Sequence, residues 1–217
     1  MPPSPAQTAR IRAEIFQHAG RLFRLRGYAG TSIDDIMLAA GLTRGAFYAH
    51  FESKADLFAE VIRAGDGLLR KLRAAEATVG GAIDAYLAKD DLAANALGCT
   101  LAALAGDVAR SSLPAQLAYA NVLHAAIGEM ARGRRRKLDP DATAAAILAV
   151  GALSLARASG DRRLNDWLLR CARRAARALL APKPRRASPK PKRSRSRRKA
   201  AGARPSTRAA RSRGGPA

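Results

Sequence analysis

Three side chains between residues 44 and 54 carry groups that bind nucleic acids. The guanidinium of Arg44 can donate two hydrogen bonds to O6 and N7 of guanine, which discriminates between bases by ~1–3 kcal/mol. The hydroxyl of Tyr48 and the ammonium of Lys54 suit phosphate oxygens, which set the register of a complex without carrying sequence information. Lys54 also stands at the start of a predicted helix, where free amides favour an anion. These residues predict contact with DNA.

The surrounding sequence predicts two short helices joined by a tight turn. Ile33, Ile36 and Met37 recur at helical spacing, and the pattern stops at Gly41, a residue suited to a turn with positive φ. A second helix is expected over residues 43–51. Its two phenylalanines, four residues apart, form a packing face, and the arginine and tyrosine fall elsewhere on its circumference.

Helix-start signals support this interpretation. A hydroxyl residue followed three positions later by an acid occurs at Thr31–Asp34 and at Ser53–Asp56, the pattern of a capped helix. Thr43 is expected to cap the second short helix in the same way, and Gly45 leaves its first turn open to a sugar-phosphate wall. Together these signals predict a helix-turn-helix, whose second helix enters the major groove of DNA.

A supporting helix is predicted upstream, over residues 8–25, and it ends before Gly27. From Arg12 to about Val61 the chain resembles the TetR family of bacterial transcription repressors. The resemblance rests on Ile15, Ala19, Leu22, Phe23, Gly27, Tyr28, Thr31, Ser32, Ile33, Ile36, Ala40, Gly41, Leu42, Gly45, Tyr48, Phe51 and Lys54. His18 departs from the family pattern, which has a small residue there, so the packing of the first helix is expected to differ locally.

The resemblance implies a set of DNA-binding residues. Residues matching Thr43, Arg44, Gly45 and Ala46 begin the recognition helix of the family and meet base edges or the groove wall. Those matching Tyr48, His50 and Lys54 contact phosphates, and those matching Thr31 and Ser32 approach the backbone at the mouth of the groove. From the residues alone two alternatives stay open, namely that Tyr48 is a half-buried core tyrosine and that His50 is a solvated residue at a helix end.

Composition favours an all-α fold. Aromatic residues make up 5% of the 217 residues, and no alternating β-branched stretch of strand length is present. Further helices are predicted over residues 54–73, 79–88, 98–110, 114–132, 140–158 and 162–180. We therefore expect a flexible N-terminus (1–7), a helix-turn-helix domain (8–53), a helical effector-binding and dimerisation domain (54–181) and a tail (182–217).

By resemblance, a small-molecule effector binds inside the second domain. The predicted lining is Leu68, Leu72, Tyr86, Leu101, Leu104, Val108, Leu117, Tyr119, Leu123, His124 and Ile127. Because few polar groups occur among these residues, the effector is expected to be apolar. His124 either bonds the ligand or is a satisfied core or surface histidine. Cys99, at a predicted helix start, is either a sensing thiol or a buried inert one.

The last two predicted helices are the expected dimer interface, because in the family they pair with their copies in a four-helix bundle. The predicted interface residues are Leu148, Gly151, Ala152, Leu153, Leu155, Leu164, Trp167 and Leu168. Small residues on the first helix allow close backbone approach, and the larger ones provide apolar area. The alternative is that these helices form only the core of a monomer. A homodimer would match a palindromic operator, with one half-site for each subunit.

The tail is strongly basic. It holds 14 of the 39 Lys and Arg residues and none of the 17 acidic ones, so it carries +14 of the net charge of +22. A segment of this composition buries no apolar area and is predicted to be disordered. A polycation binds DNA through counterion release, regardless of sequence. The tail is outside the family pattern, and it is either such an auxiliary DNA-binding segment or a solvated extension.

Other classes of function find no support in the sequence. The three histidines and two cysteines never approach the spacing of metal ligands, so we expect no metal and no cofactor. No nucleophile–base pair or phosphate-binding glycine loop is visible, so we expect no enzyme. The first ten residues lack the apolar core of a signal peptide, and the apolar stretch 142–156 is short for a membrane span. A cytoplasmic, nucleoid-associated protein with free thiols and no membrane partner is expected.

Two functional hypotheses follow. In the first, the chain is a homodimeric repressor that an apolar ligand releases from a palindromic operator. In the second, it is an architectural DNA-binding protein in which the tail dominates and site choice matters little.

Overall fold

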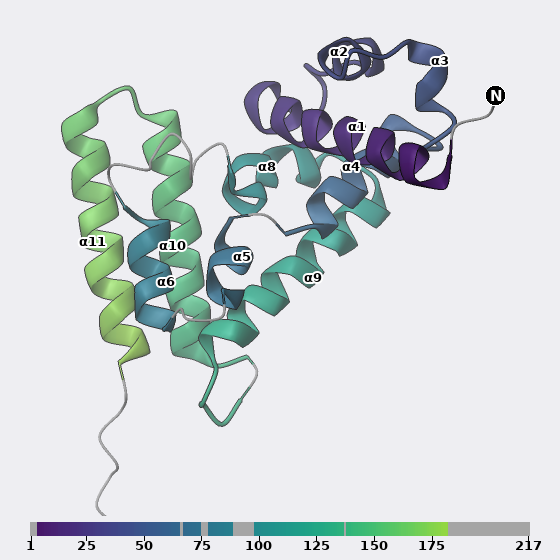
Figure 1. Ribbon diagram of the computed structural model, residues 1–217. Coiled ribbons are helices and arrows are strands. Elements are labelled where there is room, and N and C mark those ends of the chain that lie inside the picture. Colours follow the sequence, from purple (N-terminus) through teal and green to yellow (C-terminus); the bar gives the residue numbers. More distant parts are fainter. Residues whose placement is uncertain (1–3, 66, 75–77, 89–97, 137, 182–217) are drawn as a thin grey trace, which may run out of the picture. The chain divides into compact units, whose positions relative to one another are not determined.

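The computed structural model describes residues 4–65, 67–74, 78–88, 98–136 and 138–181. Within these ranges all regular structure is helical, which confirms the predicted all-α fold (Figure 1). The predicted tail and residues 89–97 lie outside the described residues. Residues up to Pro182 belong to one compact unit. The predicted domain limits therefore remain predictions.

The N-terminal helices match the predicted order. They are α1 (Pro5–Arg26), α2 (Ile33–Ala39), α3 (Arg44–Phe47) and α4 (Lys54–Arg63). α1 begins three residues before its predicted start because Ser4 caps it, accepting a hydrogen bond from the amide of Gln7 at 3.2 Å, and because a proline fits its first position. Residues 5–7 are thus helical, where a flexible segment was expected. α1 ends at Arg26, and Gly27 is its C-cap residue, in agreement with the predicted end before Gly27.

The predicted helix over residues 54–73 is wrong in one respect, because it is two helices. α4 ends at Arg63, and α5 (Leu68–Arg73) begins after Gly65 and Gly67, whose φ angles are 66° and 95°. Such angles interrupt a helix and favour glycine. A Cβ atom on Gly67 would lie 2.5 Å from Cα of Cys99, so a larger residue cannot fit there without a backbone shift.

The body of the chain (residues 68–180) contains the remaining described helices. They are α5, α6 (Val79–Tyr86), α8 (Thr100–Ala109), α9 (Leu113–Met130), α10 (Pro140–Ala158) and α11 (Arg162–Leu180). α10 and α11 pack side by side along their lengths, and α6 and α9 lie against them (Figure 1). Asp139 and Asp161 cap α10 and α11 through their carboxylates, which fixes both starts where they were predicted.

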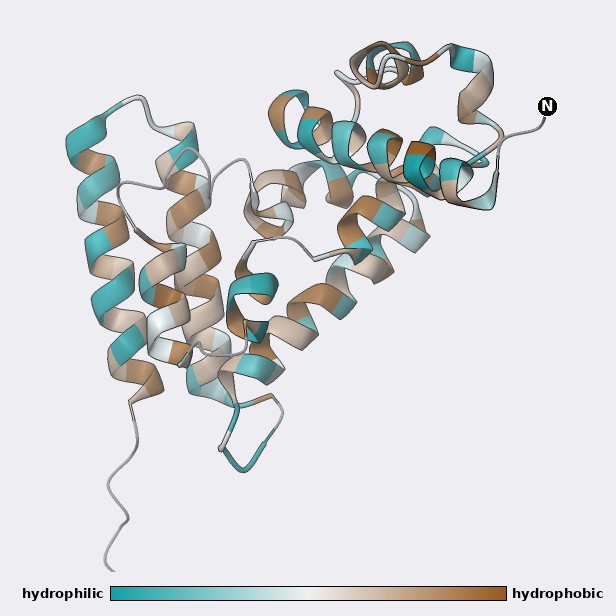
Figure 2. Ribbon diagram, in the orientation of Figure 1, coloured by the Kyte–Doolittle hydropathy of each residue, from teal (hydrophilic) through white to brown (hydrophobic). Residues whose placement is uncertain are grey.

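Two clusters of buried side chains hold the fold. The first joins α1, α2, α3 and α4, and it also receives Leu104 and Val108 from α8 and Ala115 and Ala118 from α9. The second fills the body around Tyr86, which is fully buried. The helices are accordingly two-sided, with hydrophilic residues along one side of α1 and of α11 (Figure 2). Because α8 contributes to both clusters, it connects the N-terminal helices to the body.

α10 is the one described helix long and apolar enough, by length and composition, to cross a membrane. This helix has 19 residues, so shortness alone does not decide against a span. Its inner face is part of the body core, where Ala142, Ala145, Ala149 and Leu153 are buried. This packing is that of a core helix.

Candidate nucleic-acid interface

The turn between α2 and α3 has the geometry expected of a helix-turn-helix. Gly41 has a φ of 68°. The amide of Leu42 donates to the carbonyl of Met37 at 2.9 Å, and that of Gly41 donates to the carbonyl of Leu38 at 3.1 Å. This pair of bonds is a Schellman motif, which satisfies the last carbonyls of α2 and turns the chain sharply. The positive φ predicted for Gly41 is confirmed.

α2 is capped one residue later than predicted. Ser32 Oγ accepts from the amide of Asp35 at 3.0 Å, and the amide of Ser32 donates to the Asp35 carboxylate at 2.8 Å. The capping pair is therefore Ser32 with Asp35, not Thr31 with Asp34. Hydrogen bonds from the hydroxyl and amide of Ser32 lower the pKa of the Asp35 carboxyl, with a further contribution from nearby Arg26.

α3 is shorter than the predicted helix over residues 43–51. Only residues 44–47 form regular helix, because the amide of His50 reaches the carbonyl of Phe47, three residues back, at 2.9 Å. The amide of Phe51 reaches the same carbonyl at 3.1 Å, so the turn still extends to residue 51. Thr43 is the N-cap residue by position, but its side chain makes no capping bond, contrary to prediction.

The two faces of α3 are divided as predicted. Phe47 and Phe51 are buried, with their ring centroids 5.7 Å apart. The guanidinium of Arg12 lies 4.5 Å from the Phe51 ring centroid and pairs with Glu60 at 2.7 Å, which fixes α3 between α1 and α4. The buried face fixes the orientation of α3, so the opposite face points to solvent.

The outward face carries most of the predicted DNA-binding residues. Thr43, Arg44 and Gly45 are exposed, and Ala46 and His50 are half-buried. Tyr48 is 57% exposed, so the core-tyrosine alternative is wrong. Its ring meets the buried Phe47 ring edge-on at 5.3 Å between centroids, which fixes its direction.

Arg44 has partners within the protein. Its Nη1 lies 2.6 Å from Oδ2 of Asp34 in the first turn of α2. A hydrogen bond with Tyr48, together with the negative charge of Asp34, raises the pKa of the Arg44 guanidinium. Both members of the ion pair are more than half exposed, so solvent screens their attraction and an incoming acceptor can replace the carboxylate. Asp34 was not predicted to belong to this site.

Lys54 and Thr31 point into the protein. The Lys54 ammonium donates to the carbonyls of Tyr28 at 3.1 Å and Thr31 at 2.9 Å, and it lies 4.2 Å from the Tyr28 ring centroid. Thr31 is fully buried, and its hydroxyl donates to the carbonyl of Gly27 at 2.9 Å. A phosphate contact through the Thr31 hydroxyl is thus incompatible with this conformation. For Lys54, two of three N–H groups are used internally.

Two further residues connect these N-terminal helices to the body. Asp107 on α8 accepts a hydrogen bond from the amide of Tyr28 at 2.9 Å. Arg157 on α10 donates to the carbonyl of Arg24, near the end of α1, at 2.9 Å. No local sequence signal could have identified them, because the partners are 79 and 133 residues apart. Both bonds converge on the segment that leads from α1 to α2.

The predicted effector lining divides into buried and exposed members. Leu68, Leu72, Tyr86, Leu101, Leu104, Val108 and Ile127 are buried, and Leu123 is half-buried. Leu117 is 56% exposed, so its assignment to an interior lining is wrong. His124 is also exposed, and it borders a hollow of about 570 Å³ together with Arg73, Ala125, Gly128, Glu129 and Leu138. The helical period of α9 turns both residues away from the body core.

Cys99 is fully buried at the start of α8. The hydroxyl of Tyr86 donates to its Sγ at 3.0 Å, and the hydroxyl of Tyr119 donates to the carbonyl of Leu101 at 2.8 Å. Burial raises the pKa of Tyr86 well above its usual value, with a smaller contribution from Cys99. This surrounding favours the interpretation of Cys99 as a buried thiol. Both cysteines are free, as predicted.

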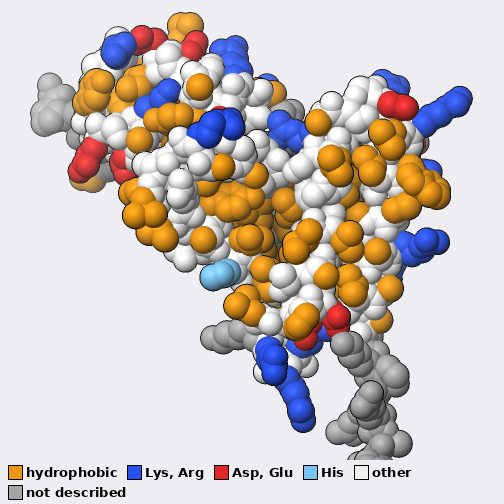
Figure 3. Space-filling view, turned by 180° about the vertical axis from the view of Figure 1, so that it is seen from behind, with side chains coloured by type: hydrophobic (Ala, Val, Ile, Leu, Met, Phe, Trp, Pro, Cys, Tyr) orange, Lys and Arg blue, Asp and Glu red, His pale blue; other side chains and the backbone are white. Residues whose placement is uncertain are grey.

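The predicted dimer residues also fall on two sides. Leu148, Leu155, Leu164 and Trp167 are exposed, the last by 60% of its surface. Leu153 is 1% exposed and belongs to the body core, so placing it in an interface is wrong. An apolar groove of about 330 Å³ runs between α10 and α11, lined by Ile147, Leu148, Gly151, Ala152, Leu155, Leu168, Cys171, Ala172 and Ala175. Hydrophobic side chains gather on the surface of these helices in Figure 3.

Comparison with known proteins supports this interpretation of the N-terminal helices. Residues 15–61 match the family model described as bacterial regulatory proteins, tetR family. The regulator AcrR of Shigella flexneri is 50% identical over 50 residues, which are 23% of this chain and 23% of the relative. The repressor KstR2 of Mycolicibacterium smegmatis is 40% identical over 62 residues, 29% of this chain and 30% of the relative. The chain thus matches less than a third of the length of either relative.

The likeness in fold extends further along the chain. A transcriptional regulator of the TetR family from Agrobacterium tumefaciens superposes with a TM-score of 0.58 at 22% identity, covering 77% of this chain and 97% of that structure. At this identity the match concerns the fold, and the family signal comes from residues 15–61. Residues 15–61 of this chain are thus similar to the tetR family of bacterial regulatory proteins, and its fold is similar to that of a solved regulator of that family.

Proposed function

We propose that this chain is a homodimeric transcriptional repressor in the bacterial cytoplasm. It binds a palindromic operator in duplex DNA through α3 and is released by a small, apolar molecule. The observation that carries the proposal is the outward face of α3, where Arg44 and Tyr48 are exposed above buried Phe47 and Phe51. An exposed arginine and tyrosine on a short helix with a rigid inner face suit base and phosphate contacts in a major groove.

Arg44 is the proposed base-reading residue. In the free protein its guanidinium pairs with Asp34 at 2.6 Å, and on binding it exchanges this carboxylate for O6 and N7 of guanine. Tyr48, His50 and the one remaining N–H of Lys54 are the proposed phosphate contacts, and Ser32 with Thr43, Gly45 and Ala46 forms the surface against the groove. Thr31 supports this surface from inside through its bond to Gly27.

The proposed dimer uses the exposed apolar face of α10 and α11. Leu148 and Leu155 line the groove between these helices, and Leu164 and Trp167 of α11 are exposed in a single subunit. A second copy would bury this face in a two-fold interface, where the same surface of each subunit meets itself. Two reading helices related by that axis match a palindrome whose half-site spacing follows from the dimer.

Release requires a connection from the body to α2 and α3. We assign it to the two bonds that converge after α1, from Asp107 to the Tyr28 amide and from Arg157 to the Arg24 carbonyl. An effector held among Leu68, Tyr86 and Leu101 would contact α5, α6 and α8, and α8 carries Asp107. Its effect on DNA affinity equals its differential affinity for the two states of the protein.

Selection of bound duplexes from a random pool tests this proposal, because operator symmetry and half-site spacing would emerge together. The best palindrome then competes against a random duplex at ~150 mM salt, where non-specific binding is weakened. We expect the palindrome to win by at least ~10³-fold. Equal competition would instead support the alternative, an architectural protein dominated by its 14 tail cations.

Single substitutions sharpen the test. Arg44→Ala should relax base preference at one position in each half-site, at a loss of ~1–3 kcal/mol on the preferred sequence. Arg63→Ala removes an exposed cation from α4 and serves as the matched control, for which we expect an unchanged preference. Uniformly weaker binding of Arg44→Ala with unchanged preference would assign Arg44 to a phosphate.

A further inference from the structure

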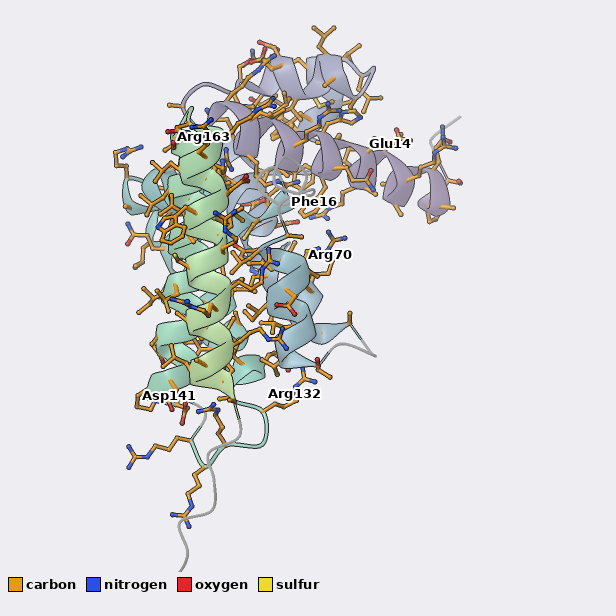
Figure 4. The ribbon with its side chains drawn as sticks, turned by 90° about the vertical axis from the view of Figure 1, so that its left-hand side faces the viewer. Glu14, Phe16, Arg70, Arg132, Asp141 and Arg163 are labelled. Carbon is orange, nitrogen blue, oxygen red and sulfur yellow. The ribbon has the colours of Figure 1, made fainter. Side chains whose placement is uncertain are left out.

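α11 carries a row of three arginines on its outer surface. Arg163, Arg170 and Arg174, which we call the arginine row, are spaced by seven and four residues and therefore lie on one face of the helix. All three are exposed. At 1.5 Å per residue the row is about 16 Å long. In Figure 4, where α11 faces the viewer, Arg163 is labelled near its beginning.

The arginine row differs in its partners from Arg173 and Arg177 of the same helix. Arg173 donates to the carbonyl of Leu87 at 2.6 Å, and Arg177 pairs with Asp84 at 3.0 Å. Within the described part of the chain, the side chains of the row form no ion pair with a carboxylate. Arg170 instead lies 5.8 Å from the ring centroid of Trp167. Arg163 stands in the first turn of α11, where a cation opposes the helix dipole. The row is therefore not explained by contacts that stabilise the fold.

The positive charge of the sequence around the arginine row favours an extended anion as its partner. α11 leads directly into the tail, and residues 162–217 together contain 20 Lys and Arg against one acid, Asp166. A duplex presents one phosphate charge per ~1.7 Å of its axis, and guanidinium groups can bond phosphate oxygens in pairs. The tail contains no apolar side chain larger than proline, so it lacks the groups that insert into a bilayer.

We propose that the arginine row is a second DNA-binding surface, which holds a duplex other than the operator without regard to its sequence. The row is on a different element from the reading helix, because α11 packs on α10 and α6 whereas α3 packs on α2. It lies beside the apolar face of Leu164 and Leu168, with Arg170 against Trp167 at the edge of that face, so the proposed dimer would place one row at the edge of the interface in each subunit. A dimer bound to its operator would then join that site to a neighbouring stretch of DNA.

The salt dependence of binding to a random duplex tests the row. In the full chain, R163Q/R170Q/R174Q should make the slope of log K against log salt shallower by about 2.7, at about 0.9 per phosphate contact. The control R110Q/R135Q/R136Q removes the same charge from exposed positions outside the row, and we expect less than a third of that change. R163K/R170K/R174K keeps the charge and should restore the slope, with an unchanged melting temperature for all three variants.

A capture assay tests the second duplex directly. The full chain is bound to bead-linked duplex carrying the selected palindrome, and a labelled random duplex is added. We expect the wild-type protein and the control to retain the label and the glutamine variant to lose most of it. Binding of the palindrome itself should stay within about threefold, which separates this proposal from the proposed operator reading. Equal capture by the glutamine variant, or equal slopes for glutamine variant and control, would overturn the proposal. The proposal would also be overturned if the glutamine variant lost binding to phosphatidylglycerol vesicles but still captured the labelled duplex. That result would assign the row to a membrane surface.

Discussion

Replacing Lys54 by methionine separates a structural role of this side chain from a phosphate contact. The ammonium donates to the carbonyls of Tyr28 at 3.1 Å and Thr31 at 2.9 Å, and it lies over the Tyr28 ring. Methionine keeps most of the aliphatic stem but makes none of these interactions. The substitution therefore releases the segment between Gly27 and Ser32, which leads into the cap of α2.

The expected destabilisation is the sum of two hydrogen bonds and one cation–π interaction. A hydrogen bond from a charged donor is worth ~1.5–3 kcal/mol, and half-burial places each of these two bonds at or below the lower value. The cation–π interaction adds ~0.5–1 kcal/mol. We expect unfolding to become easier by ~2–4 kcal/mol in total, which lowers the melting temperature by roughly 5–10 °C in a chain of this size.

Thermal unfolding and the salt dependence of operator binding are measured on the same protein. Because Lys54 makes two internal hydrogen bonds and its remaining N–H is a proposed phosphate contact, we expect the melting temperature to fall and the slope of log K against log salt at 25 °C to become shallower by ~0.9. A lower melting temperature with an unchanged slope would remove the phosphate contact, whereas a shallower slope with an unchanged melting temperature would leave only that contact. The second outcome would refute the structural role. Arg63→Met, which removes an exposed cation from the same helix, is the control and should change stability by no more than ~0.5 kcal/mol.

Asp107→Ala leaves the Tyr28 amide without its acceptor, so we expect a loss of ~1–3 kcal/mol in urea unfolding and weaker operator binding by fluorescence anisotropy. Trp167→Arg should give folded monomers by sedimentation velocity, because Trp167 lies on the exposed apolar face, whereas Leu153→Arg should unfold the body. Burial raises the pKa of Tyr86 above 10.0, so the folded chain keeps a proton that the unfolded chain releases. Stability is then full below pH 10 and falls above it, and Tyr86→Phe should flatten that fall in urea titrations at pH 9–11.

Each of these expectations has a contrary result. An Asp107→Ala protein with native stability and affinity would remove α8 from the proposed connection. A Trp167→Arg protein that remains dimeric would place the interface elsewhere. For the pH series, an equally steep loss of stability in Tyr86→Phe would assign the alkaline transition to Tyr119, whose pKa burial also raises.

Local signals were sufficient for much of the fold. The bounds of α10 and α11 agree with prediction residue by residue, because an aspartate caps each helix and a proline begins the first. The break after Arg63 was missed although Gly65 and Gly67 were visible, because apolar residues continue at helical spacing on both sides. The close surroundings of these glycines are not local, because Gly67 lies against Cys99, 32 residues further along the chain, and Gly65 lies against Val122.

In the candidate sites, too, features that depend on nearby residues could be predicted and features that depend on distant residues could not. The exposed face of α3 follows from the spacing of Phe47 and Phe51, which is local. The inward direction of Lys54 could not be predicted, because it depends on carbonyls 23 and 26 residues away. In α10, alanines cover most of the circumference, so the sequence does not tell which side is buried, and Leu153 was assigned to the wrong one.

The two glycines between α4 and α5 have a mechanical consequence. A continuous helix is stiff, so a rotation at one of its ends is transmitted to the other end. Here the helix is interrupted at Gly65 and Gly67. We therefore expect a rotation of α5 about its axis to be taken up by the backbone at these glycines and not transmitted to α4. The body instead contacts the N-terminal helices from the side, through the packing of α9 on α4 and through the hydrogen bonds of α8 and α10 to the chain near the end of α1. A movement of the body would therefore act on α4 from the side and not as a rotation along its axis.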